Sequence, residues 1–163
     1  MDAVGLLAIA LAYTLGCCNA SYYLVRWKTG GDVRAHGSGN AGARNVGRLL
    51  GPAWFALAFV LDAAKGAAAT AMGASASPAA PVAAGCALAA VVGHIWPAQL
   101  SWRGGKGIAT AMGGTLALSM GSTPPAWTFL LPALAVLILW THRRNLSHSW
   151  RHFTRARRGD IGS

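Results

Sequence analysis

The chain has 163 residues, of which 54% are hydrophobic and only 11% are charged, and its formal net charge is +10. Charged residues make up about a quarter of ordinary soluble domains, so this composition excludes that class. A positive charge of this size indicates nucleic-acid binding in a soluble protein, but basic and aromatic residues are not interleaved here outside the carboxyl-terminal tail. We therefore expect an integral membrane protein with no nucleic-acid partner.

Five apolar segments approach or exceed the roughly 20 residues that a helix needs to cross a bilayer. They are Met1–Val25, Pro52–Ala74, Ala79–Leu100 and the two shorter segments Gly107–Ser122 and Pro124–Thr141. The sequence thus predicts an all-α integral membrane protein with about five transmembrane helices and glycine-rich cytoplasmic loops. We expect residues 1–163 to form a single membrane domain that ends in a basic cytoplasmic tail, 142–163.

Basic residues outside the apolar segments occur only in alternate connections. They are Arg26, Lys28, Arg34, Arg44 and Arg48 after the first segment, Arg103 and Lys106 after the third, and Arg143, Arg144, Arg151, Arg155, Arg157 and Arg158 after the fifth. Under the positive-inside rule this alternation predicts an external amino terminus and an odd number of crossings. The tail is expected to meet anionic headgroups of membrane lipids.

The connection after the first apolar segment contains a glycine-rich, cationic stretch. Residues 37–48 read Gly-Ser-Gly-Asn-Ala-Gly-Ala-Arg-Asn-Val-Gly-Arg. Glycine exposes backbone N–H groups to an anion, and arginine supplies the opposite charge. A helix that begins near Asn45 would direct its positive end at that anion. The pattern also matches the dinucleotide fingerprint, but the strand that must precede it is replaced here by a membrane helix. A plain glycine-rich turn is the alternative.

Asp62 and Lys65 are unusual because both lie within the second apolar segment. Their i, i+3 spacing places them on one helical face. Each ionisable group at membrane depth costs about 2.5–3.5 kcal/mol on insertion scales, so such groups usually face the protein interior. The sequence therefore predicts a structural ion pair, and a direct role in substrate binding is the alternative.

The other polar motifs flank the later apolar segments. Residues 103–107 read Arg-Gly-Gly-Lys-Gly, which lacks the spacing of a P-loop and is either a phosphate-binding loop or an ordinary positive-inside loop. His94 near the end of the third segment is more typical of a hydrogen-bonded interface residue than of a base. His142 and Asn145 are three residues apart after the fifth segment, so they can face one pocket. No metal-ligand cluster occurs, and we expect neither a metal nor a cofactor.

Taken together, these motifs closely resemble those of the bacterial acyl-phosphate:glycerol-3-phosphate acyltransferase family. The signatures appear in family order from about Arg34 to Leu146. They are similar, in turn, to Asp32–His36 with 37–48, to Asp62–Gly66, to Gly93–Pro97 with Gly104–Thr110, and to His142-x-x-Asn145-Leu146. The resemblance implies transfer of an acyl chain from acyl phosphate to the sn-1 hydroxyl of glycerol 3-phosphate, without metal or acyl-CoA, at the cytoplasmic face of a bacterial inner membrane.

The resemblance also implies roles for individual residues. The matching positions that hold substrate and carry catalysis are Ser38, Arg48, Lys106, His142 and Asn145. The matching phosphate-binding positions are Gly37, Gly39, Asn40, Gly42, Asn45, Gly104, Gly105 and Gly107.

The chain departs from the family pattern in two respects. Arg44 stands where the family usually has Thr, which adds a charge beside the expected phosphates. The family also typically has seven helices and a Ser-bearing element between its third signature and the His-x-x-Asn motif. Here only residues 108–141 separate the two, and that element is absent. The resemblance is therefore to a shortened member of the family, and the alternative function is a catalytically weakened relative that binds anionic lipid or a partner enzyme.

Overall fold

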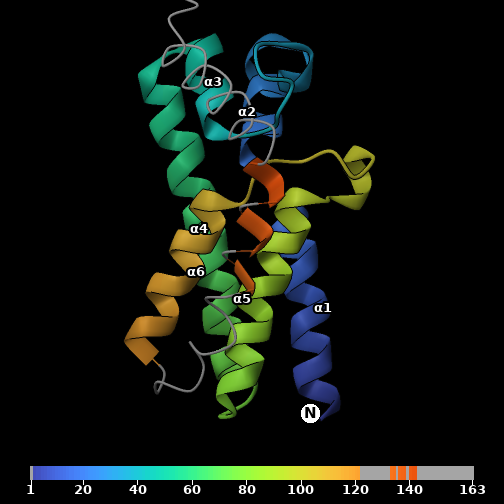
Figure 1. The fold of residues 1–163 in the computed structure, drawn as a ribbon, viewed down its shortest axis with the longest axis vertical. Coiled ribbons are helices and arrows are strands. Elements are labelled where there is room, and N and C mark those ends of the chain that lie inside the picture. Colours follow the sequence, from blue (N-terminus) through green and yellow to red (C-terminus); the bar gives the residue numbers. More distant parts are fainter. Residues whose placement is uncertain (1, 122–132, 135, 139, 143–163) are drawn as a thin grey trace, which may run out of the picture.

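The computed structural model describes residues 2–121, 133–134, 136–138 and 140–142. The regular elements among these residues are all helices, which confirms the all-α class. They are α1 (Ala3–Cys17), α2 (Ala20–Thr29), the 3₁₀ turn η1 (Val33–Ala35), α3 (Ala43–Leu50), α4 (Pro52–Ala76), α5 (Ala80–Ile95), the 3₁₀ turn η2 (Ala98–Leu100) and α6 (Ile108–Gly121). The long helices run along the long axis of the molecule, and α2 and α3 gather at the end away from the amino terminus (Figure 1).

Three helical stretches are long and apolar enough to cross a membrane, namely Ala3–Thr29, Pro52–Ala76 and Pro81–Leu100, and Ile108–Gly121 is a shorter apolar helix. The described residues between 133 and 142 are helical too. The rest of the expected fifth helix, 124–141, lies outside the described residues. The count of five crossings and the external amino terminus therefore stay predictions.

The first apolar segment differs from the single helix expected over Met1–Val25. Helix α1 ends at Cys17, and a second helix, α2, begins at Ala20 and continues to Thr29. The side chain of Asn19 accepts a hydrogen bond from the Tyr22 N–H at 2.9 Å, which is the contact of an N-cap residue. The polar cap therefore starts a new helix where hydrophobicity alone predicts a continuous one.

Helices α4 and α6 cross at a pair of glycines. A Cβ at Gly66 would collide with the backbone carbonyl of Thr110, and a Cβ at Gly113 would collide with that of Ala63. Small residues at a crossing let two membrane helices approach closely, which increases their van der Waals contact. The close approach brings the start of α6 against the middle of α4, where the ionisable pair lies.

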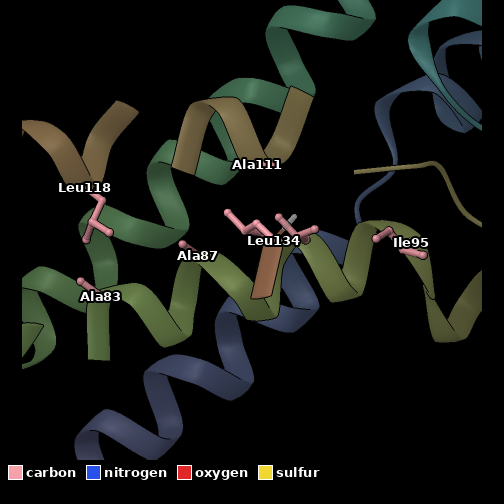
Figure 2. Close-up of a cluster of buried hydrophobic side chains, with 7 residues drawn as sticks. Ala83, Ala87, Ile95, Ala111, Leu118 and Leu134 are labelled. Carbon is pink, nitrogen blue, oxygen red and sulfur yellow. The ribbon is translucent and has the colours of Figure 1, made fainter. Parts of the chain in front are cut away.

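The core between α5 and α6 is built mainly from small side chains. Its buried members are Ala83, Ala87, Val91 and Ile95 of α5, Ala111 and Leu118 of α6, and Leu134 of the later helical segment. Figure 2 shows how these side chains fill the space between the three elements. Alanine at this interface leaves room for the later segment to pack directly against α5.

We expect Gly66→Ala and Gly113→Ala each to destabilise the protein by about 1–3 kcal/mol, because the added methyl groups overpack a backbone contact. Thermal unfolding of the purified variants in detergent measures the loss. Gly121→Ala is the matched control, since a Cβ there meets nothing within 4 Å. Unfolding temperatures for all three variants equal to that of the wild type would contradict the close crossing.

Candidate functional site

A cavity of about 190 Å³ lies where the two glycine-rich connections meet the long helices. Its lining comes from the connection before α3, from α3 and α4, from the end of α5, from the start of α6 and from the later helical segment. The lining residues are Asn40, Gly42, Ala43, Arg44, Phe55, Phe59, Asp62, His94, Lys106, Gly107, Ile108, Ala109 and His142. Residues from all the motifs identified in the sequence thus come together in one cavity.

Lys106 stands in this cavity beside two arginines. Its pKa is lowered because the ammonium group is partly buried and because Arg44 and Arg48 place positive charge near it. Cations held this close repel one another, and an anion between them would relieve the repulsion. Concentrated positive charge of this kind attracts anions.

Two helices begin at the same cavity. Helix α3 begins at Ala43, close to the start expected near Asn45, and Ala43 and Arg44 of its first turn line the cavity. The first residues of α6, Ile108 and Ala109, line it as well. The first N–H groups of a helix lack intrahelical partners, and the helix dipole is positive at that end. The α6 terminus is a part of the site that sequence reasoning missed, because its apolar residues carry no polar signal.

Asn45 shapes the first glycine-rich connection. Its Nδ2 donates to the carbonyl oxygens of Val33 at 2.9 Å and His36 at 2.8 Å, and its Oδ1 accepts from the Ser38 N–H at 3.1 Å. Gly37 has φ +55°, and a Cβ there would collide with Asn45 Oδ1. Both side-chain donors of Asn45 are used within the loop, so it has no donor left for the phosphate contact that we expected. Its observed contacts are those of a residue that holds the loop.

Gly104 and Gly105 pack against the end of α5. Their N–H groups donate to the carbonyl oxygens of Ile95 and His94, each at 3.0 Å. These amides are therefore engaged inside the protein, whereas we expected them to contact phosphate. The need for glycine is steric, because a Cβ at either position would run into His94.

Arg34 fastens the two connections to each other. Its guanidinium pairs with Asp32 at 2.7 Å, donates to Leu100 O at 2.6 Å and to Arg103 O at 3.2 Å, and lies over the ring of Tyr22. The hydrogen bond from Arg34 also holds the pKa of the Asp32 carboxyl below its usual range. The two connections are thus held together by one planar side chain with several donors.

A buried polar cluster underlies the cavity. The ammonium of Lys65 lies 2.8 Å from Asp62 Oδ1, 2.8 Å from the carbonyl oxygen of Cys18 and 2.9 Å from His94 Nδ1. Asp62, Lys65 and His94 are 1%, 8% and 3% exposed, respectively. Their charges are therefore balanced within the protein. Sequence spacing gives the pairing of Asp62 with Lys65, but no sequence signal links His94 to it.

The remaining expected site residues are distributed around the cavity. Ser38 is exposed and does not line the cavity. Arg48 lies near enough to the lining residue Lys106 for its positive charge to act on that side chain. His142 lines the cavity, and its Nδ1 lies 2.9 Å from the carbonyl oxygen of Ile138. A carbonyl only accepts, so Nδ1 donates and a neutral His142 keeps a lone pair on Nε2. Asn145 lies outside the described residues.

Gly37 and Gly39 do not line the cavity, while Gly42 and Gly107 do. No group of three or more His, Cys, Asp or Glu side chains that could hold a metal ion occurs in the described part of the chain.

The chain matches known proteins in sequence along most of its length. Residues 6–150 match the sequence model of the family described as glycerol-3-phosphate acyltransferase. Glycerol-3-phosphate acyltransferase 1 of Desulfitobacterium hafniense is 44% identical over 128 residues, which cover 78% of this chain and 63% of that relative. The Myxococcus xanthus glycerol-3-phosphate acyltransferase is 37% identical over 176 residues, covering 85% of this chain and 92% of the relative. The chain thus spans less than two thirds of the first relative's length and nearly all of the second.

The fold also matches solved structures. The crystal structure of PlsY (YgiH), an integral membrane glycerol 3-phosphate acyltransferase, in its glycerol 3-phosphate form superposes with a TM-score of 0.82 at 27% identity, covering 91% of this chain and 92% of that chain. Its lysophosphatidic acid form superposes with a TM-score of 0.81. Together with the long apolar helices, this likeness identifies a multi-pass membrane protein.

We expect Asp62→Ala to lower stability by about 3–5 kcal/mol, because it leaves the buried Lys65 ammonium without its countercharge. The unfolding temperature in detergent measures this loss. Asp2→Asn is the control, since Asp2 only caps α1 at an exposed end and asparagine can accept the same Gly5 N–H. An Asp62→Ala protein with wild-type stability and a specifically raised Michaelis constant would instead move Asp62 into the substrate site.

Proposed function

This chain belongs to the glycerol-3-phosphate acyltransferase family, and from that membership we propose that it transfers a fatty acyl group from acyl phosphate to the sn-1 hydroxyl of glycerol 3-phosphate in phospholipid synthesis. The products are lysophosphatidate and inorganic phosphate. The observation that carries the proposal is the convergence of Lys106, Arg44 and two helix amino termini on one cavity.

The cavity suits two phosphate-bearing substrates at once. Lys106, Arg44 and Arg48 supply three cations, and the first turns of α3 and α6 supply free N–H groups. Helix amino termini bind phosphate through such groups without any side chain. The two anions repel each other in water, so fixed positive groups that hold both at once also bring the reacting atoms together.

The reaction needs no covalent enzyme intermediate because acyl phosphate is already activated. The sn-1 hydroxyl oxygen attacks the acyl carbonyl carbon, the bond from that carbon to the phosphate oxygen breaks, and phosphate leaves with the electron pair. Lys106 and the neighbouring arginines neutralise the charge that develops on the leaving phosphate. The hydroxyl proton passes to an oxygen of the bound phosphate, and Nε2 of His142 is the alternative acceptor.

The apolar part of the cavity favours a lipid donor. Phe55, Phe59 and Ile108 line the same space as Lys106. An acyl chain placed along these side chains has its acyl-phosphate end at the cations and its tail toward the bilayer. We place the cavity at the cytoplasmic face of a bacterial inner membrane, since the basic connections carry it and the positive-inside rule assigns such connections to the cytoplasm.

The second candidate is a catalytically weakened relative that binds an anionic lipid or a partner enzyme. The absence of the family's Ser-bearing element from the sequence favours it. The match to 92% of the PlsY chain and the assembled cation cluster favour the active enzyme.

We expect Lys106→Ala and Arg48→Ala each to reduce acyl transfer by at least about a hundredfold, as losses of transition-state charge stabilisation generally do. Both residues are partly or fully exposed, so the variants should unfold at the wild-type temperature. Phosphate release at equal protein concentration measures the effect. Lys28→Ala removes an exposed cation that lies over Trp54, outside the cavity, and should stay active. Activity near the wild-type level in either cavity variant would contradict its assignment.

We expect the purified protein to release phosphate from acyl phosphate and glycerol 3-phosphate, to prefer acyl phosphate to acyl-CoA, and to keep its activity in a metal chelator. The reason is that the cavity offers cations and amides for phosphate. Protein that binds both substrates without releasing phosphate would establish the weakened relative. Protein that accepts only acyl-CoA would contradict the proposed donor.

A further inference from the structure

The loop that carries Lys106 rests directly on His94. Gly105, the residue before Lys106, donates its N–H to the His94 carbonyl oxygen at 3.0 Å. A Cβ at Gly105 would collide with Nε2 of the His94 ring and would lie only 2.8 Å from both the ring carbon Cε1 and the Ala41 carbonyl oxygen. One edge of the imidazole is therefore in contact with the loop, with no room for a methyl group between them.

The opposite edge of the same ring is anchored in the buried cluster. Nδ1 of His94 lies 2.9 Å from Lys65 Nζ and 3.5 Å from Asp62 Oδ1. The Lys65 ammonium has three hydrogens, and Asp62, the Cys18 carbonyl and His94 are its three acceptors. Nδ1 therefore accepts, and a neutral His94 carries its proton on Nε2. The buried cluster therefore fixes both the plane of the His94 ring and its tautomer.

We propose that His94 is a positioning residue for Lys106, with its Nδ1 edge anchored on Lys65 and its Nε2 edge forming the surface against which Gly105 packs. The ring thereby sets the place of the Lys106 ammonium in the cavity. This inference rests on the proposed function for its kinetic consequence. It assigns the Asp62–Lys65 pair a role beyond packing, since the pair holds the ring that holds the loop.

The loop itself cannot fix this position. It contains Gly104, Gly105 and Gly107, whose backbones have more conformational freedom than those of other residues. The place of Lys106 therefore depends on packing, of Gly105 against the His94 ring and of Gly107 against Val91 and Ile95. A displacement of about 1 Å at a group that holds a substrate can reduce the rate by roughly a hundredfold. A rigid, buried ring beneath a glycine-rich loop removes that freedom.

The test compares His94→Asn with His94→Gln. Asparagine places an amide oxygen where Nδ1 stands, which keeps the acceptor for Lys65 but empties the edge that faces Gly105. Glutamine reaches the Nε2 position and keeps that edge. We expect His94→Asn to unfold near the wild-type temperature while kcat/KM falls by at least about tenfold. His94→Gln should be less stable and yet retain more activity per folded molecule. Wild-type kcat/KM in His94→Asn would overturn the proposal.

Thr70→Val is the matched control for a purely structural effect. Thr70 lies on α4 like Lys65, is 2% exposed, and its hydroxyl bonds the carbonyl oxygens of Gly66 and Gly114 at 3.0 and 3.2 Å. It does not line the cavity. The control should lose stability while keeping kcat/KM per folded molecule. If His94→Asn lowers kcat/KM only in proportion to its loss of stability, as Thr70→Val does, the role of His94 is structural and the proposal is wrong.

A second readout does not depend on acyl transfer. The pKa of Lys106 is lowered by partial burial and by Arg44 and Arg48, so its neutral amine should become available to an amine-directed reagent at a lower pH than an ordinary lysine amine does. In His94→Asn the loop is released toward water, the Lys106 pKa should rise, and its labelling profile by peptide mass spectrometry should shift to higher pH while that of Lys28 stays unchanged.

The two readouts separate the two proposals. If the wild type transfers no acyl group and the Lys106 profile still shifts in His94→Asn, the proposed function fails and the positioning role stands. If the wild type is active and neither the profile nor kcat/KM changes in His94→Asn, the positioning role fails alone.

Discussion

The ammonium group of Lys65 is the interaction on which the rest of this structure depends. It lies within a membrane-length helix, where an uncompensated charge is strongly unfavourable, and it meets acceptors from three separate elements. Asp62 neutralises it from the same helix, His94 reaches it from α5, and the Cys18 carbonyl reaches it from the interruption between α1 and α2. Removing any of these acceptors leaves a buried donor without a partner. The need to satisfy this one ammonium group therefore holds the three elements together.

The break between α1 and α2 depends on two side-chain donors, the ammonium group of Lys65 and the amide of Gln99. A break in a membrane helix frees backbone carbonyls that no water can satisfy. Here the Cys18 carbonyl accepts from Lys65, and the Cys17 carbonyl accepts from Gln99 Nε2 at 2.6 Å. Asn19 then donates through Nδ2 to the Ala41 carbonyl at 3.0 Å. The break therefore becomes the place where the first helix connects to the glycine-rich connection that forms the cavity.

The cavity and its surroundings contain two groups of charged side chains, one neutralised within the protein and one with excess positive charge. Beneath the cavity, Asp62 and Lys65 neutralise each other. At its wall, Lys106 lies near Arg44 and Arg48, and Asp62, the only acidic residue that lines the cavity in the described part of the chain, is already paired. Fixed positive charge in a partly dry space attracts anions and needs no rearrangement when they bind. The glycines around it provide close backbone approach, and at Gly104 and Gly105 that approach is to the protein itself.

The sequence by itself determined the helical membrane class, the family and the segments that meet at the site, because hydrophobic length, charge alternation and motif spacing are local properties. It also determined the pairing of Asp62 with Lys65, since three residues along a helix bring two side chains to one face. The prediction of one continuous first helix was wrong at Asn19. A single N-cap residue interrupts an apolar helix only where neighbouring elements satisfy the backbone carbonyls that the break frees. The partners of His94, the α6 terminus at the cavity and the internal hydrogen bonds of Gly104 and Gly105 are contacts between distant segments. Only the packing of helices against one another decides such contacts, since a donor in a chain has no fixed acceptor until the chain is folded.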